Sequence, residues 1–372
     1  MQNNISNISI KNKIPVGILG ATGIVGQNYI RLLENHPWFD VQFVSASPNS
    51  AGKTYSQAVD GKWQMLTPIP DSVKNLIVAD ANIVDSVIGQ CKLVFSCFEI
   101  SDKKAIQDLE FGYAKAGIVV VSNASAHRWT DDVPMLLPEI NSSHLDILEL
   151  QKTNHNLTDG FVVVKPNCSI QSYLTPIYAL MEAGFEVKKL IVNTLQAVSG
   201  AGYPGVSSMD MIDNIVPYIG GEEEKTENEP LKILGSIVNN QFSNFNDLVI
   251  SAHCNRVPVI DGHTATISML FGDKKPTEQE IIDIWTNFRS VPQDLALPFA
   301  PVHPIAYTQE SNRPQPRKDR DTDKGMRCTI GRLRVCPVFD YKFVALSHNT
   351  VRGAAGGGIL NAELLVAKGL VG

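Results

Sequence analysis

Short apolar runs alternate with amphipathic, helix-forming stretches along the first half of the chain. The first apolar run covers residues 14–19, and a glycine-spaced turn and a helical pattern at 24–33 follow it. This alternation of strands and helices predicts a parallel sheet that is covered by helices on both faces. The expected strands are 14–19, 41–45, 93–98, 118–121 and 161–164.

The pattern changes after residue 165. Extended apolar runs are now separated by longer connections, which is typical of a mixed sheet in a second domain. The sequence Thr277-Glu-Gln-Glu280 has the spacing of a capping box and predicts the start of a helix. A helix at 362–367 follows a glycine-rich stretch and is expected to pack back on the first domain. The expected strands of this half are 190–197, 248–250, 265–271 and 343–346.

These patterns predict an α/β protein with two domains, which suits a chain of 372 residues. Residues 1–165 and 350–372 are expected to form a Rossmann-type dinucleotide-binding domain, and residues 166–349 an α+β domain with a mixed sheet. The first twelve residues are polar and are expected to form a frayed tail.

Composition and charge argue against several classes of protein, namely nucleic-acid-binding, membrane, secreted and metal-binding proteins. The formal net charge is -6, which argues against general nucleic-acid binding but permits a local basic pocket for a small anion. No apolar run reaches the length of a membrane span, and no secretory signal precedes the first strand. The six cysteines show no CxxC spacing, so we expect reduced thiols, no bound metal and a soluble cytoplasmic protein without a membrane partner.

Glycines recur at every third position from the first strand into the first helix, at Gly17, Gly20, Gly23 and Gly26. Such a turn lets backbone amides approach a pyrophosphate at a helix N-terminus. The alternative is a glycine-rich turn without a ligand, but the position between the first strand and the first helix favours a dinucleotide. The residues expected to touch it are Gly20, Thr22, Gly23, Ile24 and Val25.

The end of the second strand is expected to face the adenine ribose. An acidic residue there would indicate NAD, whereas residues 45–53 offer hydroxyls and a lysine but no carboxylate. This composition favours the 2′-phosphate of NADP, with a flexible polar loop as the alternative. The candidate contacts are Ser45, Ser47, Ser50 and Lys53.

Cys168 is the candidate nucleophile. It follows Asn167, a plausible helix cap, at the expected junction of the two domains, and the amides of a helix start would stabilise its thiolate. An inert buried cysteine is the alternative. His263, in a tight turn that opens a strand, is a candidate base, and Arg256 is a candidate carboxylate clamp.

Several longer motifs occur along the chain in a fixed order. Together they resemble aspartate-β-semialdehyde dehydrogenases from end to end, and specifically the branch found in archaea and fungi. The motifs are GATGIVG, SAGK, SNAS, PNCS, LQAVSGAG, PYIGGEEEK, RVPVIDGHT, NRPQPR and SHNTVRGAAGGG.

The resemblance implies a role for many residues of these motifs. Cys168 would be the nucleophile, His263 the acid–base residue, and Gln196 would orient a thioester. Arg256 would bind the substrate carboxylate and Glu222 its ammonium group, although the adjacent Glu223 and Glu224 leave the ammonium ligand open. Other implied contacts are Lys225 and Arg128 for phosphate, Asn123 for substrate, and Ser199, Gly200 and Asn349 for the nicotinamide half of NADP.

The implied reaction interconverts L-aspartate-β-semialdehyde and β-aspartyl phosphate with NADP and phosphate, in lysine, methionine and threonine biosynthesis. The resemblance also implies that the second domain carries catalysis and a subunit interface, in a homodimer or homotetramer.

Several alternatives stay open. Malonyl-CoA reductase and N-acetylglutamyl-phosphate reductase use similar chemistry, and a catalytically silent nucleotide-binding protein would lack the nucleophile or base. The acidic run 222–224 fits a solvated surface as well as a pocket. Many relatives have an arginine where this chain has Asn49, which leaves strict NADP preference undecided. The stretch 312–321 fits an interface loop or a solvated one.

Overall fold

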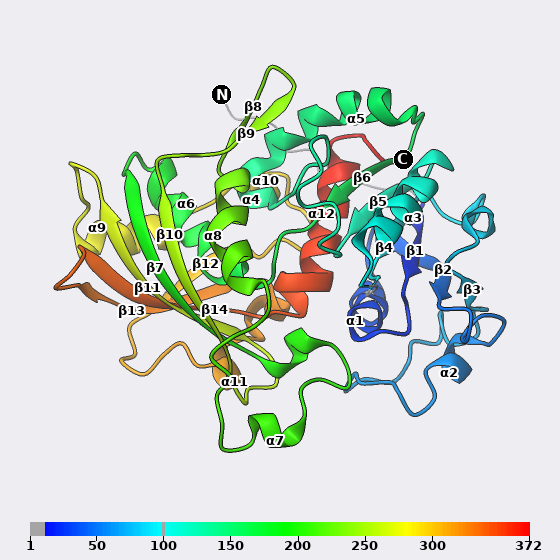
Figure 1. Ribbon diagram of the computed structural model, residues 1–372, viewed down its shortest axis with the longest axis horizontal. Coiled ribbons are helices and arrows are strands. Elements are labelled where there is room, and N and C mark those ends of the chain that lie inside the picture. Colours follow the sequence, from blue (N-terminus) through cyan, green and yellow to red (C-terminus); the bar gives the residue numbers. More distant parts are fainter. Residues whose placement is uncertain (1–11, 99–100) are drawn as a thin grey trace.

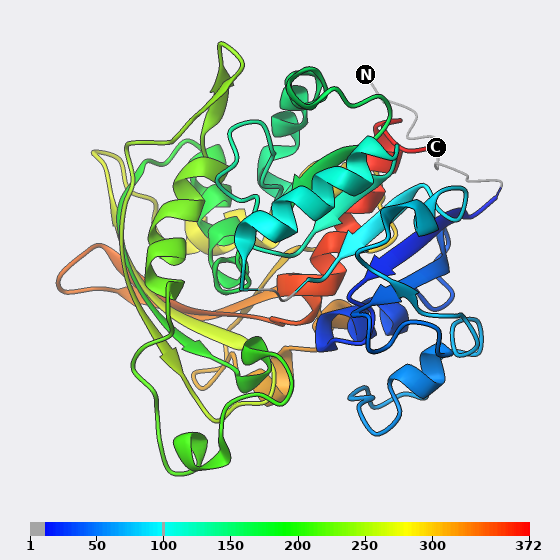
Figure 2. The same ribbon diagram turned by 45° about the vertical axis from the view of Figure 1, so that its right-hand side comes forward.

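The computed structural model describes residues 12–98 and 101–372. Its strands form two large sheets side by side, and the C-terminal helix α12 (Gly356–Ala367) runs between them (Figure 1). Residues 1–11, most of the tail expected from the sequence, lie outside the described residues. The same two-part arrangement is visible after a turn of the molecule (Figure 2).

The first sheet has the strand order β3-β2-β1-β4-β5-β6, and all its neighbouring strands are parallel. This is the order of a dinucleotide-binding fold, in which ligands bind beyond the carboxyl ends of the central strands. All five strands predicted here are confirmed, and the two-residue β3 was not predicted. The strands are β1 (Ile14–Leu19), β2 (Phe39–Ala46), β3 (Ala79–Asp80), β4 (Leu93–Ser96), β5 (Val119–Ser122) and β6 (Phe161–Val164).

The second sheet has the order β10-β7-β11-β14-β13-β12. The outer pairs β10/β7 and β12/β13 are parallel and the inner pairs are antiparallel, which confirms the predicted mixed sheet. Strands β12 and β13 were not predicted, and a separate hairpin is formed by β8 and β9. The strands are β7 (Val187–Gln196), β8 (Ser236–Val238), β9 (Gln241–Ser243), β10 (Val249–Arg256), β11 (His263–Phe271), β12 (Ile305–Thr308), β13 (Cys328–Val335) and β14 (Tyr341–Ser347).

Helices connect the strands and cover the sheets. Helix α1 (Ile24–Leu33) begins and ends at the predicted residues, and Thr277 forms the predicted capping box of α9 (Glu278–Asn287) with Glu280. The remaining helices are α2 (Tyr55–Ala58), α3 (Lys103–Lys115), α4 (Pro138–Asn141), α5 (Leu148–His155), α6 (Leu174–Glu182), α7 (Ser208–Met211), α8 (Glu222–Ile233), α10 (Val291–Asp294) and α11 (Pro316–Asp319).

The glycine-rich stretch before the C-terminus is helical, although glycine disfavours helices. A π-helical turn at Val351–Ala355 leads directly into α12. The glycines leave room for neighbours: a side chain at Gly358 would collide with the hydroxyl of Tyr29 in α1, and one at Gly353 would lie 2.8 Å from Cβ of Cys168. Close packing on α1, as predicted, therefore outweighs the low helix propensity.

A buried ion pair fixes this turn to the surrounding helices. Nη1 of Arg352 donates to Oε1 of Glu139 at 2.8 Å, and both side chains are almost fully buried. Nη1 also donates to the carbonyl oxygen of Met326, and Nη2 to Oγ1 of Thr175. Burial opposes the charge of Arg352, but Glu139 holds the pKa of the guanidinium above its ordinary value.

We expect Glu139→Gln to destabilise the protein by about 3–5 kcal/mol, because it leaves the buried guanidinium without a counter-charge. The urea midpoint of unfolding measures this change. Asp71→Asn is the control, since it removes the solvent-exposed ion pair to Lys74 and should leave the midpoint unchanged. Equal midpoints for Glu139→Gln and the wild type would contradict the prediction.

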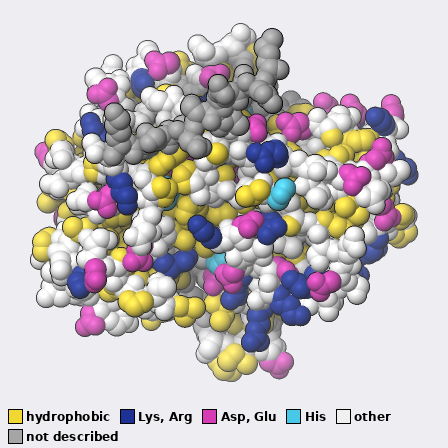
Figure 3. Space-filling view, turned by 180° about the vertical axis from the view of Figure 1, so that it is seen from behind, with side chains coloured by type: hydrophobic (Ala, Val, Ile, Leu, Met, Phe, Trp, Pro, Cys, Tyr) yellow, Lys and Arg dark blue, Asp and Glu magenta, His cyan; other side chains and the backbone are white. Residues whose placement is uncertain are grey.

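Among residues 12–98 and 101–372, no helix is both long and apolar enough to cross a bilayer. In the same residues, no group of three or more His, Cys, Asp or Glu side chains is placed to hold a metal ion. Figure 3 shows acidic and basic side chains intermixed on one face of the molecule. Selective binding of a small anion therefore requires a local arrangement of charges such as a cleft provides.

Candidate active site

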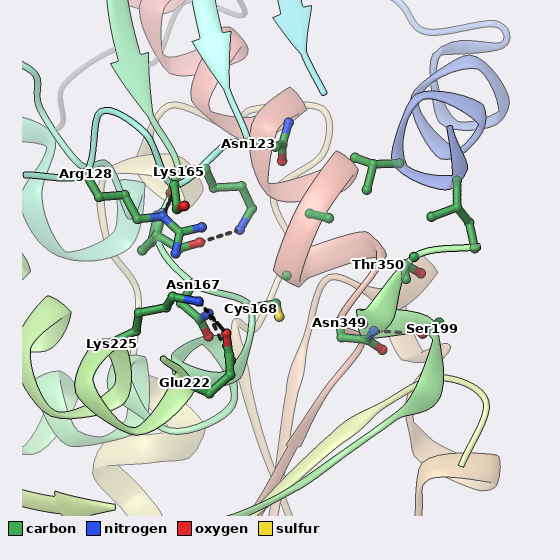
Figure 4. A pocket seen from close by; sticks show the side chains of 18 residues that line it. Asn123, Arg128, Lys165, Asn167, Cys168, Ser199, Glu222, Lys225, Asn349 and Thr350 are labelled. Carbon is green, nitrogen blue, oxygen red and sulfur yellow. Dashed lines mark hydrogen bonds and ion pairs between the residues drawn. The ribbon is translucent and has the colours of Figure 1, made fainter. Parts of the chain in front are cut away.

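A cleft of about 220 Å³ opens where the two sheets meet the N-terminal end of the π-helical turn (Figure 4). Its walls come from α1, from the loops after β5, β6 and β7, from the start of α8, and from the turn after β14. Ten of the predicted site residues line it: Ile24, Val25, Asn123, Arg128, Cys168, Ser199, Gly200, Glu222, Lys225 and Asn349.

The glycine-rich loop after β1 brings backbone close to this cleft. Gly20 has a φ of +76°, and a side chain there would lie 2.8 Å from the carbonyl oxygen of Cys97. Gly23 precedes α1 in an extended conformation, no side chain caps the helix, and its first turn has no acidic residue. The first amides of α1 are thus available to an anion.

A second cavity of about 350 Å³ lies beside the same loop. Gly20, Thr22, Gly23 and Ser47 line it, as the sequence predicted for a cofactor site. The other three predicted contacts of this region lie outside the lining. Ser45 is buried and its carbonyl oxygen accepts the N–H groups of Gly20 and Ala21, Ser50 donates its N–H to Ser47, and the Lys53 amine donates to the carbonyl oxygen of Asn49.

Cys168 and His263 meet at the base of the cleft. The distance between Sγ of Cys168 and Nε2 of His263 is 3.3 Å, although 95 residues separate them in the chain. The N–H of Ala197 donates to Nδ1 of His263 at 3.0 Å, so the neutral ring carries its proton on Nε2, facing the sulfur. Burial, and secondarily Arg256, lower the pKa of His263 to about 3.

The predicted helix start at Cys168 is wrong. Cys168 opens a short 3₁₀ turn, Ser169–Ser172, and α6 begins only at Leu174. The predicted cap role of Asn167 is also wrong, because Cys168 itself occupies the N-cap position of the turn and no side chain caps it within the described residues. The Oδ1 of Asn167 instead accepts the N–H of Ser169 at 2.7 Å. Without an aligned helix, burial and Glu222 raise the pKa of the Cys168 thiol to about 11.

The three successive glutamates of the EEEK segment point in different directions. Glu222 is buried and lines the cleft, Glu223 accepts the N–H of Cys254, and Glu224 is exposed. Within the run only Glu222 therefore faces the cleft. Burial opposes its charge, yet Lys225 at 2.9 Å and hydrogen bonds from Asn167 and Gln196 hold its pKa below the ordinary value.

Gln196 and Arg256 end the neighbouring strands β7 and β10 and lie just behind the cleft wall. Their register pairs them directly across the two strands. Gln196 donates to Glu222 at 3.2 Å, and Nη1 of Arg256 donates to the carbonyl oxygen of Ala197 at 2.7 Å. A side chain at Gly200 would lie 2.9 Å from this guanidinium, so the glycine keeps Arg256 accessible to the site.

The remaining predicted ligands also have partners within the chain. Nη1 of Arg128 donates to Glu229 at 2.8 Å, and Lys225 pairs with Glu222. The amide nitrogen of Asn123 donates to the hydroxyl of Tyr29, while its buried Oδ1 has no hydrogen-bond partner among the described residues. In this structure the cations predicted for phosphate are thus neutralised by glutamates.

Comparison with known proteins decides the family. Residues 15–148 match the NAD binding domain of semialdehyde dehydrogenases, and residues 177–352 match their dimerisation domain. The chain belongs to the semialdehyde dehydrogenase family.

Its curated relatives extend over nearly the whole chain. Aspartate-semialdehyde dehydrogenase of Schizosaccharomyces pombe is 44% identical over 96% of this chain and 99% of its own length. The Archaeoglobus fulgidus enzyme of the same name is 42% identical, with the same coverage. A crystal structure of the Candida albicans enzyme with NADP superposes with a TM-score of 0.87 at 38% identity, covering 96% of this chain and 100% of that one.

In this member of the semialdehyde dehydrogenase family, the turn after β14 returns to the neighbourhood of Cys168 and His263. Asn349 donates to Oγ of Ser199 at 2.8 Å and accepts the N–H of Gly262, next to His263. The 312–321 stretch supports the turn before β11 from outside, since Arg320 donates to the carbonyl oxygen of Asp261 and Pro316 packs on Gly262. This loop is therefore packed against its own chain.

Sequence reasoning missed several residues of the cleft wall, including Lys165, Ser125 and Thr350. Lys165 had a signal that could have been used, because it is a charged residue at the end of an otherwise apolar buried strand, β6. Thr350 and Ser125 carry no comparable signal, since small polar residues are common in loops.

Proposed function

We propose that this chain is an aspartate-semialdehyde dehydrogenase that interconverts L-aspartate-β-semialdehyde and β-aspartyl phosphate with NADP and phosphate. The observation that carries the proposal is the 3.3 Å approach of Cys168 and His263 in a cleft that also holds Glu222, Lys225 and Arg128. Nucleophile, ring donor and groups of both charges are thus gathered at one place, which suits a substrate with an ammonium, a carboxylate and a phosphate.

NADP fits the residues that are present. The uncapped start of α1 would hold its pyrophosphate. The buried Oδ1 of Asn123, which has no partner within the part of the chain that the structure describes, offers an acceptor inside the cleft. Ser47 and Lys53 at the end of β2 would contact the adenosine half, and Asn349 the nicotinamide half. When bound, NADP supplies the hydride acceptor of the oxidative direction.

The chain's own groups supply the remaining chemistry. Cys168 reacts as the thiolate, after its thiol proton has been released to solvent. Its Sγ bonds to the aldehyde carbon as the C=O π pair moves to the oxygen, and this oxygen accepts a hydrogen bond from the Nε2–H of His263. Loss of hydride from the same carbon re-forms the C=O bond, and the adduct becomes a thioester on Cys168. An oxygen of phosphate then attacks this carbon, the C–S bond breaks, and the thiolate leaves with β-aspartyl phosphate as product.

The charges behind the cleft suggest where each end of the substrate binds. Arg256 has no carboxylate partner within the described chain and would hold the α-carboxylate. Glu222, which three side chains already orient, would receive the ammonium group. Gln196 donates to the carboxylate of Glu222 and would orient the carbonyl group of the thioester relative to it.

The match to a dimerisation domain supports a homo-oligomer. We propose a homodimer or a dimer of dimers built on residues 166–349, with residues 1–165 and 350–372 as the cofactor domain. A cytoplasmic location remains a prediction from the sequence.

The assay of this proposal follows NADPH absorbance with L-aspartate-β-semialdehyde, with and without phosphate. We expect phosphate-dependent NADPH formation, and a slower reaction with NAD because residues 45–53 offer no carboxylate to a 2′-hydroxyl. Absence of turnover in a preparation that binds NADP would contradict the substrate assignment, and malonyl-CoA with NADPH would then be the next substrate to test.

A further inference from the structure

Lys165 is a buried lysine whose hydrogen-bonding capacity is largely unused. It follows β6, and its side chain is 2% exposed. Among the described residues, its amine has a single partner, the carbonyl oxygen of Pro166 at 3.4 Å. A lysine amine can donate up to three hydrogen bonds, and buried polar groups normally have partners. Within the described residues, the hydrogen bonds of the Lys165 amine therefore do not account for its burial.

A second buried lysine shows what a structural role requires. The amine of Lys232 donates to the carbonyl oxygens of Arg128, Thr130 and Val133 and lies over the ring of Phe242. Those bonds account for its burial without any ligand. Lys165 has no comparable set of partners and instead lines the catalytic cleft.

Two glycines place the end of Lys165 beside the nucleophile. A side chain at Gly353 would lie 2.8 Å from Cβ of Cys168, and one at Gly357 would lie 2.7 Å from Cε of Lys165. Helix residues four apart are neighbours on one face, about 5–6 Å from each other. Cys168 and Lys165, both in the segment after β6, therefore pack against neighbouring positions of this glycine-lined helix face and line the same cleft. Figure 4 shows Lys165 next to Arg128 and above Cys168.

The other cations of the cleft wall already have counter-charges. Arg128 is paired with Glu229 and Lys225 with Glu222, whereas no carboxylate lies within ion-pair distance of Lys165 among the described residues. Burial lowers the pKa of Lys165 to about 7. The charged or titratable groups that act on it are Cys168 and Glu229, which favour its protonation, and Arg128 and Arg352, which oppose it.

We propose that Lys165 is a third cationic ligand of the phosphate subsite, and that it takes up a proton as the phosphate group binds. The identity of the anion rests on the proposed function. The entering dianion would supply both the missing acceptors and the missing negative charge, between the Arg128 side of the cleft and Cys168.

The pH dependence follows from the sign of this coupling. A nearby anion raises the pKa of Lys165 above about 7, so binding takes up a proton wherever the pH lies between the pKa values of the empty and occupied sites. The affinity for the anion is then highest below pH 7, where Lys165 is already protonated in the empty site. It weakens as the pH rises above 7. Lys165→Gln removes this dependence, because glutamine does not titrate.

Calorimetry with inorganic sulfate tests the proposal directly. Sulfate is a dianion that does not itself titrate near neutrality, unlike phosphate. Titrations at pH 8 in two buffers of different ionisation enthalpy give the protons taken up per sulfate. We expect uptake approaching one proton in the wild type and none in Lys165→Gln or Lys165→Met. At pH 6.5 both variants should bind sulfate about 10- to 100-fold more weakly, the loss of one charge-assisted hydrogen bond.

Controls separate this role from others. Lys225→Gln should weaken sulfate binding but keep the proton uptake, and Cys168→Ala should keep it too, which excludes the thiol as the titrating group. NADP affinity and the thermal midpoint of the Lys165 variants report their folding. Proton uptake or sulfate affinity that is unchanged in folded Lys165→Gln would overturn the proposal. Calorimetry with sulfate needs no turnover. The role of Lys165 can therefore fail while the assay with L-aspartate-β-semialdehyde succeeds, and the reverse.

Discussion

Cys168→Ala is expected to abolish phosphate-dependent NADPH formation from L-aspartate-β-semialdehyde, a loss of at least about 10³-fold. The reason is that the proposed route passes through a covalent bond to Sγ, for which a methyl group offers no replacement. Stopped-flow or steady-state absorbance of NADPH measures the loss, and binding of NADP should be retained because the cofactor contacts lie on other residues.

Cys91→Ala is the matched control for this prediction. Cys91 is also a free cysteine, but it is buried in the first domain, where its Sγ lies close to Gly17, and burial raises its pKa to about 12. Its replacement should leave turnover near the wild-type rate. Substantial activity in Cys168→Ala, or an equal loss in both variants, would contradict the assignment of the nucleophile.

His263→Ala is expected to lower kcat by about 10²- to 10⁴-fold, the usual contribution of a positioned acid–base group. Because the pKa of His263 is lowered to about 3, the ring stays neutral at every working pH. Its own protonation should therefore leave no inflection in the rate between pH 5 and 9. A pH profile of kcat/KM for both proteins checks the two expectations.

The tautomer of His263 adds a sharper test. With Ala197 donating to Nδ1, the proton on Nε2 faces Cys168, so the ring first acts as a hydrogen-bond donor. Acting as a base at Nε2 requires the ring proton to move and this bond to break, at a cost of about 0.5–1.5 kcal/mol. His263→Asn, which keeps an N–H donor, should retain more activity than His263→Ala, and equal losses would argue for proton acceptance instead.

The structure also changes the account of how Cys168 is activated. A helix start was expected to stabilise the thiolate, but the residue opens a 3₁₀ turn and burial with Glu222 raises its pKa to about 11. The groups that act in the opposite direction are cations, first Lys165 and then Arg128 and Arg256. Activation in this site therefore depends on which charges surround the thiol, and on their change when substrate enters.

Local patterns predicted much of the framework. The runs at 14–19 and 161–164 were predicted to the residue, because buried parallel strands read as continuous apolar segments between turns. The capping box at Thr277 was equally readable, since both of its hydrogen bonds are local. The unpredicted strand β12 is held by parallel pairing with β13, which comes well after it in the chain and which a local pattern does not encode. The strand β13 forms a hairpin with the adjacent β14, so its signal was local and was missed.

The sequence by itself determined which residue types were available and, through ordered motifs, the family and the candidate positions for its chemistry. Only the tertiary structure decided how those residues meet. It turned Glu222 into the cleft and left Glu224 in solvent, and it brought His263 to within 3.3 Å of Cys168. It also placed Lys165 in the same cleft, with no ion-pair partner among residues 12–98 and 101–372. The physical reason is that burial, charge pairing and pKa depend on neighbours from distant segments, whereas a sequence pattern reports only on neighbours along the chain.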